Sequence, residues 1–396
     1  MEKRCIYLDN AATTKTAPQV LEAMLPYFSE HYGNPSSIYG LAGESREAVD
    51  KAREQIARVL NAPAKDIYFT AGGTEADNWA LKAAFEAYKG KGNHIITTKI
   101  EHHAILHTCQ YLEKERGARV TYLDVDEQGV VKLDQLEAAI TPETILISVM
   151  FANNEIGTLQ PVKEIGAIAR EHGILFHTDA VQAFGQVPID VEEMGIDMLS
   201  SSAHKINGPK GIGFLYIRKG LKLRSFIHGG AQERKRRAGT ENVPGIVGYG
   251  AAAALAAETM EERAAKEQAL RDHMIKRILE EIPHSRLNGH PQKRLPNNVN
   301  VCFRFVEGES LLILLDMAGI CASSGSACTS GSLDPSHVLL AIGLPHEIAH
   351  GSLRLTLSHE TTREEVDYTV DQIKEIVERM RGMSPLYEDF LKKQSE

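Results

Sequence analysis

Apolar and polar residues follow two different periods along the chain, and blocks of the two kinds alternate from about residue 40 to 217. Seven short apolar runs have the length and composition of buried strands, and they are residues 67–70, 94–98, 119–125, 144–150, 174–180, 197–203 and 211–217. Between them lie segments with helical spacing, as where Val49, Ala52 and Ile56 share one face. Pro161 and Gly173 mark the ends of another such segment. The alternation predicts an α/β fold with a mostly parallel seven-stranded sheet between helices.

The pattern changes after Pro244, where a long Ala-, Glu- and Arg-rich helical segment begins and continues to about Glu281. A mixed tail follows, with a strand-like run at 297–305, an apolar helix at 309–319, an alternating run at 351–358 and a final helix from about Thr362. We therefore expect a large domain at residues 15–257. A smaller α+β domain would consist of residues 1–14 and 258–396 and would carry a loop at 321–335.

Composition narrows the class of protein. With 396 residues, 43% hydrophobic and 24% charged, the chain can bury a full core, and a net charge of -9 disfavours a protein that coats nucleic acid. Its five cysteines form neither a dense framework nor a CxxC pair, which fits a reducing cytoplasm without disulfides or structural zinc. The N-terminus lacks the apolar core of a signal peptide, and no apolar stretch has the length of a membrane span, so we expect a cytoplasmic protein.

Ligands of α/β proteins bind at the carboxyl ends of the strands, so residues just after each predicted strand are the candidates for function. After residues 67–70 the chain passes through Gly72, Gly73 and Thr74 into a helix. These residues can form a turn whose main-chain N–H groups bind an anion. A tight turn capped by threonine, without an anion, would have the same sequence. Asp179, at another strand end, can cap the next helix or hold a ring nitrogen in its protonated state.

The next strand end carries Ser202, His204 and Lys205, followed by a turn at 207–209. An exposed lysine in a turn is usually solvated. Lys205, however, lies in a polar turn 26 residues after Asp179, where a lysine can form a Schiff base with an aldehyde cofactor. We expect this second role.

His102 and His103 follow the predicted strand at 94–98. A pair of histidines can bind metal, but no carboxylate or cysteine with suitable spacing stands beside them, so we expect no intrinsic metal site. A single histidine that stacks on a flat ring or moves protons is the expectation.

Residues 321–331, CASSGSACTSG, are all small, yet they hold two of the five cysteines. Such a segment buries little apolar area against the entropy of ordering it, so mobility is expected. The pattern leaves open whether Cys328 is idle or is delivered to a partner.

Several motifs occur in one order over nearly the whole chain. They are GNPSS at 33–37, NNEIG at 153–157, the Asp179/Gln182 block, HK at 204–205, RAGTEN at 237–242 and SSGSACTSG at 323–331. Together they resemble the cysteine desulfurases of the NifS/IscS group, in the class V aminotransferase family. The series is specific, whereas any one motif would be weak. The resemblance implies pyridoxal-phosphate fold type I.

The resemblance also implies roles in holding pyridoxal 5'-phosphate. Lys205 would carry the cofactor and move protons, and Asp179 would pair with the ring nitrogen. His102 would stack on the ring and assist acid–base steps. Gln182 would hydrogen-bond the phenolic oxygen, and Asn154 would support the edge of the ring.

The cofactor's phosphate would be held by Gly73, Thr74, Ser202 and His204, and by Thr240 reaching in from a second subunit. The last contact implies a homodimer.

Arg354 would grip the carboxylate of the substrate, with Asn34 nearby. The alternating run agrees, because the leucines at 353, 355 and 357 share one face and leave Arg354 on the other. A bidentate guanidinium also suits a carboxylate better than a lysine would.

The implied reaction converts L-cysteine to L-alanine, and the Cys328 thiolate takes the sulfur as a persulfide. An acceptor protein would receive it, such as an iron-sulfur scaffold or a tRNA thiolation enzyme, and Cys328 is also a candidate transient ligand of an iron-sulfur cluster. A loop of small residues would let Cys328 reach both places. Cys321, at the anchored edge of the loop, is expected in the core.

Other functions share part of this pattern. An aminotransferase would share Lys205 and Asp179 but would need a keto-acid acceptor. A selenocysteine lyase or the SufS group carries its cysteine on a shorter segment. A cofactor-free scaffold is disfavoured by the intact set of Lys205, Asp179 and His102. The basic run at 233–237 leads directly to Thr240 at the cofactor edge, which argues against a nucleic-acid patch.

Overall fold

The computed structural model describes residues 5–324 and 335–395 of the chain. Cys328 lies outside the described residues, so its predicted role stays a prediction. Within the described ranges, no helix has both the length and the apolar character needed to cross a membrane.

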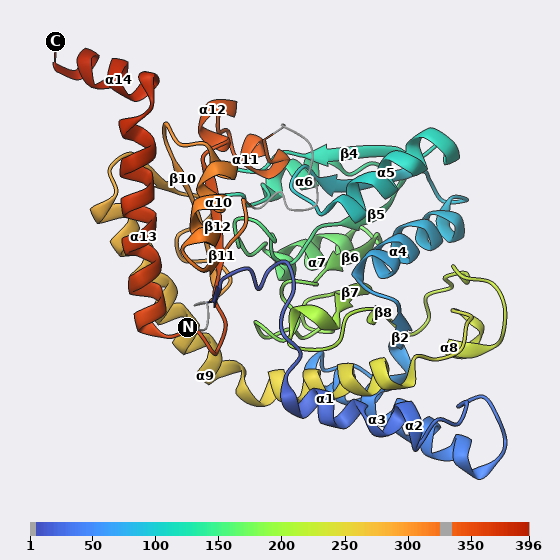
Figure 1. Ribbon diagram of the computed structural model, residues 1–396. Coiled ribbons are helices and arrows are strands. Elements are labelled where there is room, and N and C mark those ends of the chain that lie inside the picture. The colour runs from blue at the N-terminus through green and yellow to red at the C-terminus, as the bar shows by residue number, and fades with distance from the viewer. Residues whose placement is uncertain (1–4, 325–334, 396) are drawn as a thin grey trace.

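Seven strands form one large sheet (Figure 1), and each predicted apolar run contains one of them. The strands are β2 (Ile67–Thr70), β3 (His94–Thr98), β4 (Arg119–Leu123), β5 (Thr144–Ser148), β6 (Leu175–Asp179), β7 (Met198–Ser202) and β8 (Gly213–Ile217). Their order is β2-β8-β7-β6-β5-β3-β4. Strand β8 is antiparallel to both neighbours, and the other pairs are parallel. The predicted mostly parallel, seven-stranded sheet is therefore confirmed.

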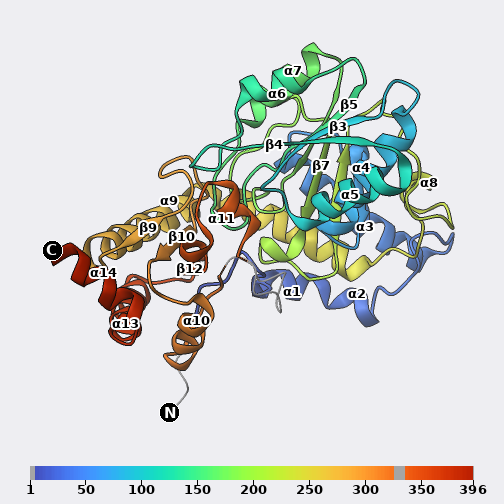
Figure 2. The same ribbon diagram turned by 90° about the horizontal axis from the view of Figure 1, so that it is seen from above.

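Helices cover both faces of the sheet (Figure 2), and most of its strands are therefore buried on both faces. Helices α4 and α5 pack on one face around Trp79, while α3, α7 and α9 pack on the other around Phe176. The helices of this part are α1 (Pro18–Met24), α2 (Pro26–Ser29), α3 (Gly40–Val59), α4 (Gly73–Tyr88), α5 (His103–Arg116), α6 (Leu133–Ala139), α7 (Val162–Glu171), α8 (Gln232–Lys235) and α9 (Val243–Glu281). Short 3-10 helices η1 (Ala64–Asp66) and η2 (Ala203–Lys205) lie beside β2 and β7.

The predicted helix ends are confirmed where the sequence marks them. Pro161 directly precedes α7, and Gly173 follows it with a φ of 64°, in the left-handed region that favours glycine. Helix α3 buries Val49, Ala52 and Ile56, as its apolar spacing predicts.

The C-terminal third forms a second, smaller layered unit. Its three-stranded antiparallel sheet has the order β12-β10-β9, and a short parallel pair joins β1 to β11. The elements are β1 (Ile6–Tyr7), β9 (Ser285–Leu287), β10 (Asn298–Phe303), α10 (Gly308–Met317), β11 (Ile320–Cys321), α11 (His337–Ala341), α12 (His346–Ala349), β12 (Ser352–Thr356), α13 (Arg363–Gly382) and α14 (Pro385–Ser395). Leu8, Met274 and Val301 belong to a hydrophobic cluster of its own. The boundary at 257/258 stays a prediction.

Two details of this unit differ from the expectation. The final helical pattern is not one helix, because α13 ends at Gly382 and Pro385 begins α14, where a proline lacks the N–H needed to continue α13. Cys321 ends β11 half-buried and is not part of the core.

The N-terminal segment connects the two units and determines what faces the space between them (Figure 1). The Leu8 amide donates to the Cys321 carbonyl at 2.9 Å, and the Thr356 amide donates to the Leu8 carbonyl at 2.7 Å. Farther along, the Thr14 amide donates to the His204 carbonyl at 2.9 Å. Residues 9–13 are thereby held between the small sheet and the end of β7.

The basic run at 233–237 begins with a buried carboxylate. Glu233 makes two hydrogen bonds of 2.8 Å with the Arg53 guanidinium and accepts one of 2.9 Å from the Phe69 amide. Both side chains of the ion pair are less than one-tenth exposed. Arg237 pairs with Glu75 at 2.9 Å, so both ends of the run serve internal contacts.

We expect Glu233→Gln to lower the free energy of unfolding by about 3–5 kcal/mol, because it leaves the Arg53 charge buried without its partner. The matched control is Glu193→Gln, which removes the exposed partner of Lys163 and should cost about 0–1 kcal/mol. Denaturant unfolding followed by circular dichroism measures both. Equal losses in the two variants would contradict the prediction.

Candidate active site

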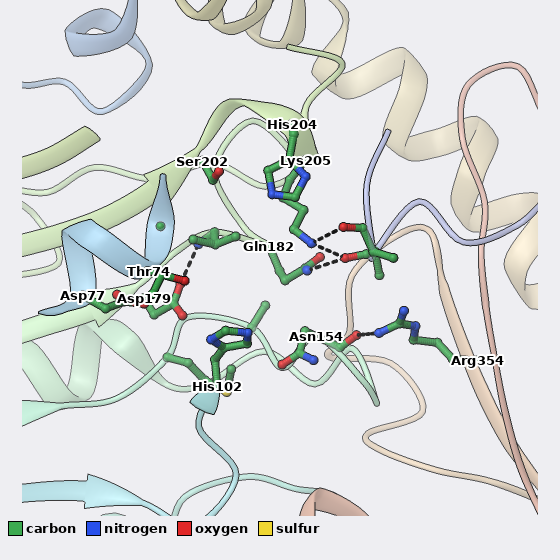
Figure 3. Close-up of a pocket in the computed structure, with 16 residues that line it drawn as sticks. Thr74, Asp77, His102, Asn154, Asp179, Gln182, Ser202, His204, Lys205 and Arg354 are labelled. Carbon is green, nitrogen blue, oxygen red and sulfur yellow. Dashed lines mark hydrogen bonds between the residues drawn. The ribbon is translucent and has the colours of Figure 1, made fainter. Parts of the chain in front are cut away.

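A cavity of about 420 Å³ opens at the carboxyl ends of the central strands (Figure 3), a size that suits a small ligand. Ten of the residues that the sequence singled out line it: Gly73, Thr74, His102, Asn154, Asp179, Gln182, Ser202, His204, Lys205 and Arg354. They come from segments up to about 280 residues apart, between Gly73 and Arg354. Strand-end reasoning pointed to most of these residues, whereas Asn154, Gln182 and Arg354 came from the resemblance, and the role of each residue stays a prediction.

One end of the cavity is the N-terminus of α4. Gly72 caps this helix without a side-chain hydrogen bond, so the N–H groups of the first turn remain for an anion. Glycine suits this position, because an added Cβ would lie 2.6 Å from Cγ2 of Val181 and would force a shift. Ser202 and His204 face the same end, and a hollow continues from them toward the surface.

His204 is neutral at this anion-binding end. Burial, followed by the Lys205 charge, lowers the pKa of His204 to about 4. Its Nδ1 lies 3.1 Å from Oγ1 of Thr13 in the N-terminal segment. The ring therefore acts as a hydrogen-bonding group and adds no charge.

Asp179 ends β6 and forms the floor of the cavity with only 5% of its surface exposed. Burial raises the pKa of its carboxyl to about 6. Two contacts act in the opposite direction and lower the pKa: the Val181 amide, which donates a hydrogen bond at 2.9 Å, and the Lys205 charge. At neutral pH the carboxyl is ionised, and a cation inside the cavity would be attracted to it.

Lys205 extends from η2 into the cavity. Its Nζ donates to the carbonyl oxygens of Ala11 at 2.5 Å and Ala12 at 2.8 Å (Figure 3). Nε2 of Gln182 donates to the same Ala11 oxygen at 3.0 Å. The amine is thus delivered to the cavity and held there by the N-terminal segment.

His102 presents a neutral ring. It caps α5, with Nδ1 accepting a hydrogen bond of 3.1 Å from the Ala104 amide, so its proton is on Nε2. Burial first, and the Lys205 charge second, lower the pKa of His102 to about 4. A neutral ring can stack on an aromatic ligand without the cost of burying a charge.

Arg354 lies on β12, at the far side of the cavity from Asp179 (Figure 3). Its guanidinium donates to the Asn154 carbonyl at 3.0 Å and to Asp9 at 2.8 Å. The Nε is buried and has no hydrogen-bond partner among the described residues. The adjacent leucines are buried on the opposite face, as predicted, and Arg354 is on the face that lines the cavity.

Two predicted residues are not brought to the cavity by the described part of this chain. Asn34 is exposed, and its Oδ1 accepts a hydrogen bond of 2.9 Å from the Ser36 amide. Thr240 is exposed after α8, and a residue predicted to act in another subunit is not tested by one chain.

Sequence reasoning missed several groups that shape the site. Asp9, the carbonyls of Ala11 and Ala12, and Asp77 carry no local pattern that points to a cavity. Asp77 lies one turn inside α4, and one ligand atom from each of Asp77, His102 and Asp179 falls within 4.8 Å of the others. Helical spacing alone would have placed Asp77 beside Gly73 but not beside Asp179.

The donor set fits pyridoxal 5'-phosphate. An uncapped helix start with a glycine that tolerates no Cβ suits the phosphate, and an amine in the cavity suits the aldehyde. A buried carboxylate at the floor suits a protonated ring nitrogen. Gly73, Thr74, Ser202 and His204 would hold the phosphate.

Comparison with known proteins points to one family. Residues 6–369 match the family model described as aminotransferase class V. A cysteine desulfurase IscS of Clostridium botulinum is 58% identical over 99% of both chains, and one of Methanosarcina thermophila is 58% identical over 97% of this chain and 95% of the relative. A solved NifS-like protein superposes with a TM-score of 0.89, at 41% identity over 94% of this chain and 99% of that one. A structure of SspA in complex with cysteine has a TM-score of 0.79, at 40% identity over 90% of this chain and all of the other.

Gly73→Ala should weaken binding of pyridoxal 5'-phosphate by about 5- to 150-fold, because overpacking of this kind costs about 1–3 kcal/mol. The new Cβ displaces Val181, whose amide holds Asp179. Gly90→Ala is the matched control, since a Cβ at Gly90 meets nothing within 4 Å. Titration of the apoprotein with the cofactor measures both affinities, and unchanged binding in Gly73→Ala would contradict this account of the cradle.

Asp179→Asn should change how the stability of the apoprotein depends on pH. Between about pH 4 and 6 the folded protein keeps a proton on Asp179 that the unfolded chain has lost, so this carboxyl lowers stability as pH rises, by up to about 1.4 kcal/mol per pH unit. The variant should lose that slope. Urea unfolding across this window measures it.

Asp190→Asn serves as the control of opposite sign, because the Glu193 amide is the main cause that lowers the pKa of Asp190. That carboxyl adds stability above its unfolded pKa and loses it toward acid. A slope of the Asp179→Asn variant equal to that of the parent would show that the buried carboxyl does not hold its proton as described.

Proposed function

The chain belongs to the class V aminotransferase family, among the pyridoxal-phosphate-dependent cysteine desulfurases, and we propose that it converts L-cysteine to L-alanine and captures the sulfur on Cys328 as a persulfide. The proposal depends on one observation: Lys205, Asp179 and Arg354 line the same cavity. The chain that holds them is 58% identical to a cysteine desulfurase IscS. These residues supply an amine, a ring-nitrogen partner and a carboxylate grip.

Pyridoxal 5'-phosphate, when bound, would supply an aldehyde for an amine and an electron sink for the electron pair left when an α-proton departs. The protein's own groups then determine orientation and protonation. Asp179, ionised at neutral pH, keeps the ring nitrogen protonated. Lys205, already inside the cavity, carries the cofactor and moves the proton at the substrate's α-carbon.

Substrate is oriented by the far side of the cavity. Arg354 lines the cavity and binds the carboxylate of L-cysteine through its guanidinium. Because Asp9 already holds one end of the guanidinium, the fork is fixed before substrate arrives. His102 faces the reacting centre as a neutral ring that donates through Nε2.

Sulfur transfer balances without any other reactant. The Cys328 thiolate attacks the sulfur of the substrate, the C–S bond breaks, and the proton released by the thiol is returned to the carbon framework that leaves as alanine. Cys328 keeps one additional sulfur atom as its persulfide. The product passes to an acceptor, for which we propose an iron-sulfur scaffold or a tRNA thiolation enzyme in the cytoplasm, with Cys328 as a transient cluster ligand.

A second copy of the chain completes the proposed enzyme. Six large apolar side chains are exposed between the start of α1 and the start of α3, and they are Leu21, Leu25, Phe28, Tyr32, Ile38 and Tyr39. Exposed apolar groups that gather in this way support a protein contact. In the homodimer, Thr240 would reach the phosphate end of the other subunit's cavity.

Purified protein given L-cysteine and a reductant should release alanine and sulfide in equal amounts without a keto acid. Cys328→Ala should lower this rate by about 10³-fold or more, because the nucleophile is lost, while the cofactor stays bound. Cys321→Ala, in the same segment, is the matched control and should keep the activity. Alanine is measured by chromatography and sulfide by a colour reaction.

The need for a keto acid separates this function from that of an aminotransferase, which would share Lys205, and Lys205→Ala in the same assay tests the role of the lysine itself. It should abolish alanine formation from L-cysteine. An aminotransferase would instead show turnover only when a keto acid is supplied, and wild-type protein that behaves in that way would overturn the proposal.

A further inference from the structure

Asp77 is a buried acid at the cavity that the mechanism above does not use. It is 1% exposed, it lines the same cavity as Asp179, and its Oδ1 has no hydrogen-bond partner among the described residues. Figure 3 shows the two carboxyl groups side by side at the end opposite Arg354. Ligand atoms of Asp77, Asp179 and His102 lie within 4.8 Å of one another.

Two carboxylates at this distance in a buried site do not both ionise at neutral pH without compensating cations. Asp179 has such compensation, from the Val181 amide at 2.9 Å and from the Lys205 charge. Asp77 has much less. Nε2 of His177 lies 3.7 Å from its Oδ1, but burial lowers the pKa of His177 to about 3, so that ring is neutral.

The other groups that face Asp77 add no positive charge. From β7, the Ser200 hydroxyl lies beside it and acts to lower its pKa, and the same hydroxyl bonds to His177 at 2.9 Å. From the segment before α5, Glu101 is a third buried acid, and burial raises its pKa to about 8. Burial, and then the Asp179 charge, raise the pKa of Asp77 well above its usual range. The single negative charge of the cluster at neutral pH is therefore on Asp179.

We propose that Asp77 is a positioning residue that stays a neutral carboxylic acid and, by acting through Asp179, keeps one negative charge opposite the ring nitrogen of bound pyridoxal 5'-phosphate. The proposal rests on the cofactor assignment of the proposed function but not on sulfur transfer. A second charge at Asp77 would compete with Asp179 for the ring nitrogen's proton. A neutral acid instead fills the polar site beside Asp179 and supports its orientation.

The chemical state of Asp77 can be observed directly. In the holoenzyme at neutral pH, infrared spectroscopy should show the carbonyl band of a protonated carboxylic acid that shifts in D₂O and is lost in Asp77→Asn. Glu101→Gln is the control, because Glu101 contributes a band of its own that must be subtracted. Asp77→Asn with no loss of a carboxylic-acid band would overturn the proposal.

Cofactor affinity tests the positioning role. Asp77→Asn carries the same charge as the neutral acid and keeps a polar group, so its dissociation constant for pyridoxal 5'-phosphate should stay within about threefold of the parent. Asp77→Leu keeps the bulk but removes the hydrogen bond with the Ser200 hydroxyl, and binding of pyridoxal 5'-phosphate should weaken by about 2- to 12-fold. Asp179→Asn removes the charge itself and should weaken binding by about 12- to 150-fold.

The pH titration of the bound cofactor's absorbance gives a readout that a purely structural role would not move. Its midpoint should be retained in Asp77→Asn and shifted in Asp77→Leu, with thermal unfolding of each variant as the check on folding. A midpoint in Asp77→Asn that shifts as far as in Asp179→Asn would mean that Asp77 is charged, and an unchanged Asp77→Leu would mean that it positions nothing. Protein that shows these effects yet makes no alanine would refute the proposed function and leave this inference standing.

Discussion

The rest of the site depends on one buried negative charge, that of the Asp179 carboxylate at the end of β6, which is 5% exposed. A buried carboxylate is unfavourable unless hydrogen bonds and cations compensate it. The Val181 amide supplies one hydrogen bond and Lys205 supplies the opposite charge. The turn after β6 and the 3-10 helix after β7 must therefore be fixed relative to each other, and the parallel pairing of these two strands does this.

The polar groups around this charge are mostly neutral. Burial first, and the Lys205 charge second, lower the pKa values of His102 and His204, so the two rings stay neutral beside the one charged lysine. Burial raises the pKa of Glu101 to about 8, so this acid keeps its proton at neutral pH. The cavity thus has one anion and one cation on its cofactor side, whereas a second cation, Arg354, stands on the substrate side against Asp9. Charge separation of this kind allows a cofactor and a substrate carboxylate to be bound in the same space with fixed orientations.

Much of this arrangement follows from the sequence, because strand and helix periods are local and strand ends of a parallel sheet meet at one edge. That reasoning located Asp179, Lys205 and the Gly73 cradle. It did not locate Asp77, because which face of α4 meets β6 depends on packing between elements and not on spacing within the helix. Nor did it locate the break before Pro385, since residues 362–395 keep a helical pattern that a single proline interrupts.

The N-terminal segment could not be assigned from local pattern either, since its contribution is made by main-chain carbonyls that every residue has. Ala11 and Ala12 accept from Lys205, Ala11 accepts from Gln182, and two positions earlier Asp9 holds Arg354. One short stretch therefore touches both the amine proposed to carry the cofactor and the guanidinium proposed to bind substrate. Residues 9–12 therefore join the hydrogen bonds around Lys205 to those around Arg354 over four residues of backbone. Lys205, on the 3-10 helix after β7, and Arg354, on β12 of the small sheet, are in this way held by one main-chain segment, because that segment lies between the two units.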